Sequence, residues 1–322
     1  MPRLYLGVDG GGTNCRIRLA DAELKTLGEA KKGRANLQID NGDPGYEAII
    51  EGTRDVFAQA GISYDETSNT YACFGMAGGR LESARQSFAE RKWPFGGVKV
   101  YDDIDIAHAG ALGGEDGAVI IAGTGSAALA MVEGKRHQCG GWGFFIGDQM
   151  SGAILGRELI RIAVEAKDGL VDGSPLTEAV IGRFGGTVDQ VMDWSFGSAA
   201  GLRIVDKNGD DGSSDEELER LLERYSIGRG PAEYASVIPL FFEYYNQGDP
   251  VADQLMDLQF SFVDNYVSWF KARGAKKMAV VGGFADRLFP LLRKRYGDFM
   301  AERRGEPLDG ALILAKQSYP PE

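Results

Sequence analysis

The sequence predicts an α/β protein with two related halves, and two observations support this prediction. Short apolar segments with the alternation of strands are interspersed with longer segments that carry apolar residues at helical spacing. Strands that alternate with helices are typical of a partly parallel sheet covered by helices. In addition, a strand, a Gly/Thr-rich loop and a second strand occur twice, near residues 4–19 and 118–132. This internal repeat indicates two domains of similar construction.

The first of these loops is expected to be the tip of a β-hairpin that binds phosphate. Alternating apolar residues at 4–8 lead into Asp9 and three consecutive glycines, whose bare backbone tolerates positive φ and the close approach of a ligand. A Rossmann loop or a P-loop would have to open a helix at this point. Residues 15–19 alternate instead between apolar and polar side chains, which is the periodicity of a strand.

The other elements of the first half alternate as the α/β class requires. One helix ends at Gly61, a suitable C-cap, and the last strand leads into Asp102 and Asp103 at the start of a further helix. The expected strands are residues 24–30, 70–79 (with a glycine turn) and 97–101, and the expected helices are residues 45–60, 81–93 and 103–112.

The second half repeats the opening pattern after a glycine-rich seam at residues 113–117. A strand at 118–122, the loop Gly123–Ser126 and a strand at 127–132 are expected to form a second hairpin. This loop matches the weak dinucleotide pattern G-x-G-x-x-A, but a turn at 133–135 arrives too early for the helix that the pattern needs. The later helices are expected at residues 151–166, 174–184, 187–194, 231–270, 285–296 and 308–315, with one strand at 277–281.

Length and composition describe an ordinary globular protein, and the charge argues against some partners. The chain has 322 residues and a formal net charge of −12, so a nucleic-acid or anionic-membrane surface is not expected. With no Lys beside the first loop, we expect backbone amides and a metal ion to hold a phosphate. The three cysteines are far apart, and no apolar run has the length of a membrane span or a signal peptide, which makes the cytoplasm the expected location.

Two short patterns suggest metal sites, and we favour a structural interpretation of each. His137 and Cys139 have the spacing of half a metal site, but the chain has one other His only. Residues 206–217 carry acidic or amide side chains at positions 1, 3, 5 and 12 of a calcium loop, yet Asp211 occupies the position that requires Gly. We therefore interpret 206–217 as part of a solvated acidic insertion.

A series of short motifs occurs in order along the chain. It consists of LGVDGGGTN, an Asn in G-x-x-N-L, an Asp ahead of A-H-A-G-A-L-G-G, IIAGTGS, GGWG-x-x-x-GD, VVGG and P-L-D-G-A. The series resembles the BadF/BadG/BcrA/BcrD-type ATPase family, and within it the N-acetylglucosamine and glucosamine kinases. The resemblance implies two ribonuclease H-like domains, as in sugar kinases, actin and heat-shock chaperones, with an ATP cleft between them. It places the domains at 1–113, with a helix at 307–322 packed back on it, and at 114–306, with an insertion near 197–230.

The resemblance also implies which residues form the site. Asp9 would hold Mg²⁺ through water, and Asp103 would be the catalytic base. The two hairpin tips and a glycine pair would bind ATP through Gly10, Gly11, Gly12, Thr13, Asn14, Gly123, Thr124, Gly125, Ser126, Gly282 and Gly283. The amino sugar would contact Asn36, Asp103, Thr124, Trp142, Asp148 and Gly152.

Several of these positions have alternative interpretations. Asp103 lies at a helix N-terminus, where the dipole favours an ionised carboxylate that can accept a hydroxyl proton. Asp102 and Asp105 are neighbouring candidates as N-cap or solvated residues, and Asp102 adds a charge where relatives often carry Asn or Thr. Asp9 suits a turn before glycine. Trp142 offers a flat face to a sugar, or belongs to the core.

Together, the residues and the resemblance predict an ATP- and Mg²⁺-dependent kinase that phosphorylates the 6-hydroxyl of N-acetylglucosamine, with glucosamine as the alternative. Relatives usually carry Glu after the Asp of G-D, whereas this chain continues Gln149-Met150, which leaves the accepted sugar open. A reductase-activating ATPase with a shared iron–sulfur cluster would need interface cysteines, and a nucleotide sensor without turnover would not need Asp103. Aromatic residues within 231–270 suggest a homodimer contact, and no nucleic-acid or membrane partner is expected.

Overall fold

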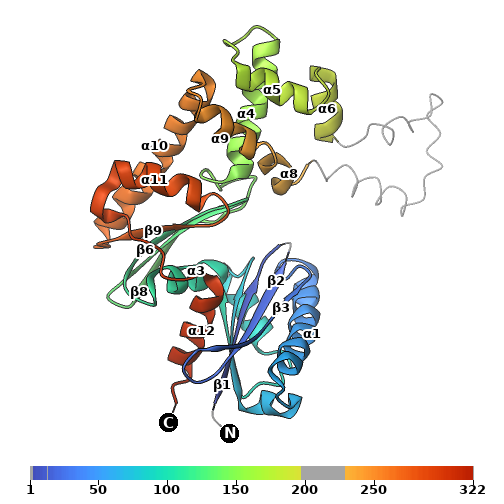
Figure 1. Ribbon diagram of the computed structural model, residues 1–322, viewed down its shortest axis with the longest axis vertical. Coiled ribbons are helices and arrows are strands. Elements are labelled where there is room, and N and C mark those ends of the chain that lie inside the picture. The colour runs from blue at the N-terminus through green and yellow to red at the C-terminus, as the bar shows by residue number, and fades with distance from the viewer. Residues whose placement is uncertain (1–2, 13, 197–228, 322) are drawn as a thin grey trace, which may run out of the picture. The chain divides into compact units, whose positions relative to one another are not determined.

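The computed structural model describes residues 3–12, 14–196 and 229–321 (Figure 1). The expected α/β class is confirmed, with a five-stranded and a four-stranded sheet. The described chain forms two compact units. The first comprises Met1–Ala122, Ala127–Gly141 and Ser268–Glu322, and the second comprises Gly123–Ser126 and Trp142–Val267.

The first sheet contains the predicted N-terminal hairpin. Its strands lie in the order β3-β2-β1-β4-β5, and β1 is antiparallel to β2 and parallel to β4. The hairpin register sets Asp9 opposite Arg16 and Gly10 opposite Cys15, which leaves a four-residue tip. The strands are β1 (Leu4–Gly10), β2 (Cys15–Ala20), β3 (Thr26–Lys32), β4 (Thr70–Met76) and β5 (Gly97–Asp102).

Different helices cover the two faces of this sheet (Figure 1). On one face, Leu6 and Ile17 pack in a cluster with Phe57 of α1. On the other face, Tyr5 packs in a cluster with Leu312 of α12, and α12 also contacts α3. Alternate residues of β1 therefore face different helices. The helices are α1 (Asp43–Ala60), α2 (Glu82–Ala89), α3 (Asp103–Leu112) and α12 (Pro307–Ser318).

Helix α2 is shorter than the predicted helix at 81–93, and an aromatic cluster accounts for the difference. After Ala89 the chain folds back, and the indole N–H of Trp93 donates to the carbonyl of Phe88 at 3.0 Å. The Trp93 ring lies 4.7 Å from that of Phe74, centre to centre. Burial of Trp93 in this cluster replaces further turns of helix.

The second sheet contains one strand that the sequence did not predict. Its order is β8-β7-β6-β9, with β6 parallel to β9 and β7 antiparallel to β8. The unpredicted strand is β8, whose residues KRHQCG show no apolar alternation. The strands are β6 (Gly117–Ala122), β7 (Ser126–Val132), β8 (Lys135–Gly140) and β9 (Met278–Val281), followed by α11 (Ala285–Tyr296).

The second unit is mainly helical, but the segment predicted as helical at 231–270 forms three successive helices, with Gly248 at positive φ between the last two. Its helices are α4 (Gly152–Lys167), α5 (Pro175–Arg183), α6 (Val188–Phe196), α8 (Pro231–Ala235), α9 (Ile238–Tyr245) and α10 (Pro250–Ala272), the last of which continues into the first unit. Buried Asp249 accepts hydrogen bonds from Ser174 Oγ at 2.9 Å and from the amide of Leu176 at 3.0 Å, which ties the start of α10 to the start of α5. The acidic segment 206–217 lies outside the described residues.

No helix in the described part of the chain combines the length and the apolar character that a bilayer crossing needs.

The contact between α12 and α3 leads to a first prediction. A Cβ atom on Gly310 would overlap the carbonyl oxygen of Ile106 and the amide nitrogen of Gly110. We predict that Gly310→Ala lowers the free energy of unfolding by about 1–3 kcal/mol, the usual effect of overpacking. Urea denaturation followed by circular dichroism measures this change.

Gly182→Ala is the matched control for this prediction. Gly182 is also helical, but a Cβ atom there meets nothing within 4 Å. Alanine is therefore expected to be neutral, or to stabilise α5 by up to about 1 kcal/mol. An equal loss of stability in both variants would contradict the tight contact at Gly310.

Candidate functional site

The carboxyl ends of three neighbouring strands meet at one edge of the first sheet. The parallel pairing of β1, β4 and β5 aligns Gly10 with Met76, and Met76 with Asp102. In open α/β sheets, ligands bind at this edge. Asp9 near the end of β1 and Asp103 directly after β5 are therefore brought to the same edge.

The first glycine tip is fixed at its base and open at its apex. The carbonyls of Gly10 and Gly11 accept backbone hydrogen bonds of 2.7 and 2.8 Å from the segments that follow β4 and β3. The amide of Gly11 donates to the carbonyl of Asn14 at 2.8 Å. Gly12 is exposed, and a Cβ atom there would meet nothing within 4 Å. Such a tip is accessible to an anion; Thr13 lies outside the described residues.

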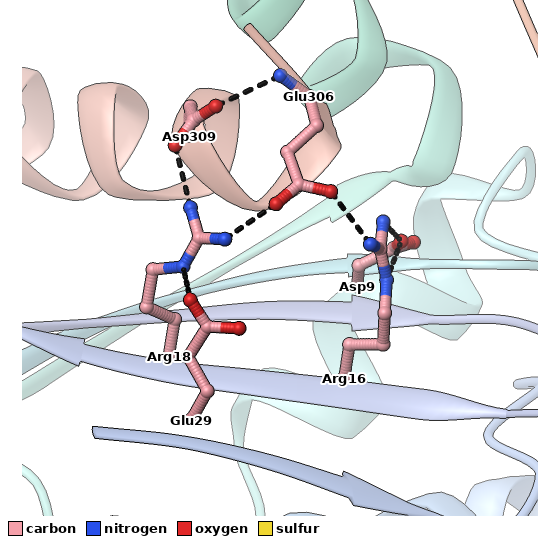
Figure 2. A network of polar contacts seen from close by, with 6 residues as sticks. All are labelled: Asp9, Arg16, Arg18, Glu29, Glu306 and Asp309. Carbon is pink, nitrogen blue, oxygen red and sulfur yellow. Dashed lines mark hydrogen bonds and ion pairs between the residues drawn. The ribbon is translucent and has the colours of Figure 1, made fainter. Parts of the chain in front are cut away.

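Arg16 is a cation beside this tip that the sequence-based expectation overlooked. Its Nε and Nη2 donate to Asp9 Oδ2 at 3.2 and 2.7 Å (Figure 2). The expectation that backbone amides and a metal alone hold a phosphate did not consider Arg16, which was counted only as a polar strand position. A four-residue tip makes Arg16 the cross-strand neighbour of Asp9, and this register was the signal that could have identified it.

A cavity of about 620 Å³ in the first unit brings several of the predicted residues together. Its volume lies within the usual range for small-molecule sites. The wall includes Asp9, Arg16, Asp103, Gly282 and the segment 302–307. The structure thus joins the proposed metal ligand, the proposed base and one glycine of the VVGG pair in a single cavity. The C-terminal segment 302–307 was not expected there, since no sequence motif in it indicates a ligand-binding role.

Asp103 lies in an environment that opposes its ionisation. It is the first residue of α3, and Asp102 is the N-cap, whose amide donates to Asp105 Oδ2 at 3.1 Å. Burial, followed by the negative charges of Asp102 and Asp9, raises the pKa of Asp103 well above its usual value. The expected effect of the helix dipole is therefore outweighed by burial and by like charge.

Asp102 is held by two residues of the unpredicted strand β8. Gln138 Nε2 donates to Asp102 Oδ2 at 2.8 Å. Arg136 lies 3.7 Å from the same oxygen and donates Nε to Asp105 Oδ1 at 2.6 Å. Burial raises the pKa of Asp102, and the hydrogen bond from Gln138 opposes this effect. The extra carboxylate beside Asp103 is thus fixed in place.

The second glycine tip belongs to the second unit and rests on the N-terminus of α4. The carbonyl of Gly123 accepts a hydrogen bond from the amide of Gly152 at 2.8 Å, and Ser126 Oγ accepts one from the amide of Met150 at 3.2 Å. Ser151 caps α4 by accepting from the amide of Ile154 at 3.1 Å. The predicted positions Gly123 and Gly152 are therefore direct neighbours.

Asp148 lies against this second tip. A Cβ atom on Gly125 would be 2.9 Å from Asp148 Oδ2. The Asp148 backbone has a φ of 60°, a conformation that Asp tolerates better than most residues. Burial raises the pKa of Asp148, while hydrogen bonds from the amides of Ser126 and Gly143 oppose the rise.

The residues around Asp148 differ in exposure. The Trp142 side chain is 58% exposed, so the alternative of a core Trp is wrong. Gln149 is exposed and Met150 is 4% exposed, so Gln149 is the more accessible of the two unusual residues. Trp142, Thr124, Asp148 and Gly152 all lie in the second unit.

Asn36 lies at the same sheet edge as the first tip. It forms an isolated β-bridge with Ala77, the residue that follows β4. Its Oδ1 accepts a hydrogen bond from the amide of Gln38 at 2.8 Å. The amide NH₂ is therefore the part of Asn36 that can donate to a ligand. Gly283, next to Gly282, is exposed.

Comparison with known proteins identifies the family. The sequence model of the BadF/BadG/BcrA/BcrD ATPase family matches residues 6–295. The chain belongs to the BadF/BadG/BcrA/BcrD ATPase family. The glucosamine kinase of Vibrio cholerae is 28% identical over 315 residues, which cover 97% of this chain and 95% of that protein. The N-acetylmuramic acid/N-acetylglucosamine kinase of Clostridium acetobutylicum is 30% identical over 170 residues, 52% of this chain and 55% of that protein.

A solved structure confirms the fold of this BadF/BadG/BcrA/BcrD member. The crystal structure of a candidate N-acetylglucosamine kinase from Chromobacterium violaceum superimposes with a TM-score of 0.79. The two chains are 26% identical, and the match covers 98% of this chain and 99% of the other. Membership of an ATPase family makes ATP the nucleotide used by this protein.

The residues of this ATPase family member fit a Mg²⁺ ion held mainly by the nucleotide. The part of the chain that the structure describes contains no group of three or more His, Cys, Asp or Glu side chains placed to hold a metal. Mg²⁺ bound with a nucleotide needs one or two carboxylates, because phosphate oxygens and water supply its other ligands. Asp9 is a carboxylate of the cavity wall whose side chain is 22% exposed, so it would be available for this role.

The position of Arg16 leads to a prediction about ATP. Arg16→Gln removes a positive charge from the cavity wall. We expect ATP affinity in excess Mg²⁺ to fall about ten-fold or more, which corresponds to the loss of one hydrogen bond to a charged group. Isothermal titration calorimetry measures this change.

Arg91→Gln is the control for Arg16. Arg91 pairs with Asp43 at 2.7 Å and does not line the cavity. ATP affinity is expected to stay at the wild-type value in this variant. If Arg16→Gln also keeps wild-type affinity, Arg16 does not contact the nucleotide.

Proposed function

We propose that this protein transfers the γ-phosphoryl group of ATP to the 6-hydroxyl of an amino sugar, with N-acetylglucosamine as the preferred substrate. The coarser conclusion, an ATP-dependent sugar kinase that acts on an amino sugar, is supported by kinase relatives that match half to nearly all of the chain. The observation that carries the proposal is the shared cavity of Asp9, Arg16 and Asp103. Phosphoryl transfer to a hydroxyl requires a carboxylate base and phosphate-neutralising groups within one site.

In the proposed reaction, Asp103 accepts the proton of the 6-hydroxyl. The sugar oxygen forms a bond with the γ-phosphorus while the bond from that phosphorus to the β–γ bridging oxygen breaks, and ADP leaves. The raised pKa of Asp103 makes it a stronger base than an ordinary Asp. The guanidinium of Arg16 and the first glycine tip compensate the phosphate charge. Asp9 would hold Mg²⁺, which would supply positive charge to the phosphate groups.

We also propose the residues that bind the sugar and the limits of the two domains. Asn36, Thr124, Trp142, Asp148 and Gly152 are assigned to the sugar on the family pattern. Trp142 suits this role because an exposed indole can stack on the apolar face of a sugar ring. The proposed domains comprise residues 1–113 with 307–322, and residues 114–306.

Glucosamine is the second candidate substrate. One relative that matches almost the whole chain is a glucosamine kinase. The exposed Gln149 stands where relatives usually carry Glu, so a neutral side chain replaces a carboxylate near Asp148. Loss of that carboxylate is expected to weaken binding of a cationic amino group more than that of a neutral acetamide, which favours N-acetylglucosamine.

The experiment that tests the proposed function is a coupled assay of ADP release with Mg²⁺-ATP and a panel of hexoses. N-acetylglucosamine is expected to give the highest rate above the sugar-free blank. Asp103→Asn is expected to lower kcat about 10²- to 10⁴-fold, the usual contribution of a general base. Asp43→Asn, at the first position of α1, is expected to keep the wild-type rate.

Two outcomes of this assay would contradict the proposal in different ways. If no hexose stimulates ADP release, the kinase function is wrong. If Asp103→Asn keeps the wild-type kcat, Asp103 is not the base, although the sugar kinase reaction stands.

The fixed charge of Asp102 leads to a prediction about pH. A base must be ionised, so activity falls as the pH drops through the raised pKa of Asp103. Asp102→Asn keeps the shape and the N-cap but removes a negative charge that raises this pKa. The pKa of Asp103 is then lower, and the acid limb of the kcat profile is expected to move to lower pH.

The measurement is the pH dependence of kcat in both proteins at saturating substrates. On the alkaline side of the acid limb the two rates are expected to converge, because Asp103 is then ionised in both. An acid limb at the same pH in both proteins, or one displaced to higher pH, would contradict the role of Asp102.

A further inference from the structure

Glu306 joins the two arginines of β2 through one carboxylate. Arg16 Nη1 donates to Glu306 Oε2 at 2.6 Å, and Arg18 Nη2 donates to Glu306 Oε1 (Figure 2). Arg16 and Arg18 are two residues apart on one strand, so their side chains leave the same face of the sheet. This face is the one that α12 covers, and Glu306 is the N-cap of α12.

The first turn of α12 holds Glu306 in this place. The amide of Glu306 donates to Asp309 Oδ2 at 2.8 Å, and Asp309 Oδ1 accepts from Arg18 Nη1 at 2.5 Å. Arg18 also donates to Glu29 at 2.8 Å. Arg18 thus has two carboxylate partners besides Glu306, and its charge stays compensated when Glu306 binds Arg16.

Arg16 lies between two carboxylates of the cavity wall. It donates to Asp9 through Nε and Nη2, and to Glu306 through Nη1. A guanidinium with Asp9 as its sole partner would compete with any cation for that carboxylate. Glu306 reduces this competition, because its carboxylate still balances the charge of Arg16 when Asp9 binds a cation.

We propose that Glu306 is a positioning residue that shares Arg16 with Asp9 and so keeps Asp9 available to the divalent cation that accompanies ATP. The proposal rests on the proposed function in one respect, the use of Mg²⁺ with ATP, and is independent of the sugar. It gives the N-terminus of α12 a part in nucleotide binding that acts through Arg16 and Asp9.

The test is the dependence of ATP affinity on Mg²⁺. Dissociation constants for ATP are measured by calorimetry on the full chain in excess Mg²⁺ and in excess EDTA, and their ratio is the Mg²⁺ enhancement.

In Glu306→Gln, Asp9 is the one carboxylate that still pairs with Arg16, and Mg²⁺ must displace Arg16 from Asp9 in order to bind there. The Glu306 and Arg16 side chains are both more than a third exposed, and solvent screening limits the expected fall in enhancement to about three- to five-fold. An unchanged enhancement would overturn the proposal, as would a wild-type protein with no enhancement.

Two control variants separate the contact from a general loss of charge. Glu29→Gln makes the same substitution in the same network but removes a partner of Arg18 alone. Glu178→Gln removes a carboxylate that pairs with Lys167 and belongs neither to this network nor to the cavity wall. Both are expected to keep the wild-type enhancement. A fall in either that equals the fall in Glu306→Gln would overturn the proposal.

Glu306→Asp keeps the charge with a shorter reach and provides a second variant. Its enhancement is expected to lie between those of Glu306→Gln and the wild-type protein, and a value no higher than that of Glu306→Gln counts against the proposal. Thermal unfolding without ligand checks the fold of each variant. If Glu306→Gln does not fold, Glu306→Asp must fall below the wild-type enhancement, and the wild-type value would overturn the proposal.

The hexose assay distinguishes this proposal from the proposed function. If no hexose stimulates ADP release while Glu306→Gln loses enhancement, the sugar kinase function is wrong and the positioning role stands. If N-acetylglucosamine is phosphorylated while the enhancement is unchanged, the positioning role is wrong and the function stands.

Discussion

The pairing of β1 with a strand on each side is the constraint on which the site depends. On one side, the antiparallel register sets Asp9 opposite Arg16. On the other side, the parallel register with β4, and through β4 with β5, brings Asp103 to the same edge. A slip of one residue would turn Asp9 to the other face of the sheet, away from α12. Burial of Leu4, Leu6 and Val8 against the α1 face opposes such a slip.

Much of the fold could be predicted because its signals are local. Alternation followed by three glycines indicated the first hairpin, and helical spacing placed the starts of α4 and α11 to within one residue. Strand β8 was not predicted because it lacks the apolar alternation of a buried strand. Its residues Gln138 and Arg136 instead form hydrogen bonds with Asp102 and Asp105. The end of α2 was predicted too late because Trp93 packs on Phe74. Helical spacing in the sequence does not reveal such a contact between distant segments.

The candidate site could be predicted only as far as its residues lie in local motifs. Asp9, Asp103 and Gly282 come from three such motifs, and the structure places them in one cavity. Arg16 was within reach of a register argument, but Glu306 was not, since its partners lie almost the whole chain away. The ionisation of Asp103 was also beyond sequence reasoning. The helix dipole is visible in a sequence, whereas the burial that outweighs it depends on tertiary packing.

The pairing of Arg16 with Glu306 has a consequence for the order of events during synthesis. These two residues are 290 positions apart, so they meet only after nearly the entire first unit has been translated. At about 5–20 residues per second, Asp9 and Arg16 are synthesised about 15–60 s before Glu306. Of the two carboxylates that accept hydrogen bonds from Arg16, only Asp9 has been made during that interval. The hydrogen-bond partners of Arg16 are therefore complete only after the start of α12 has been synthesised.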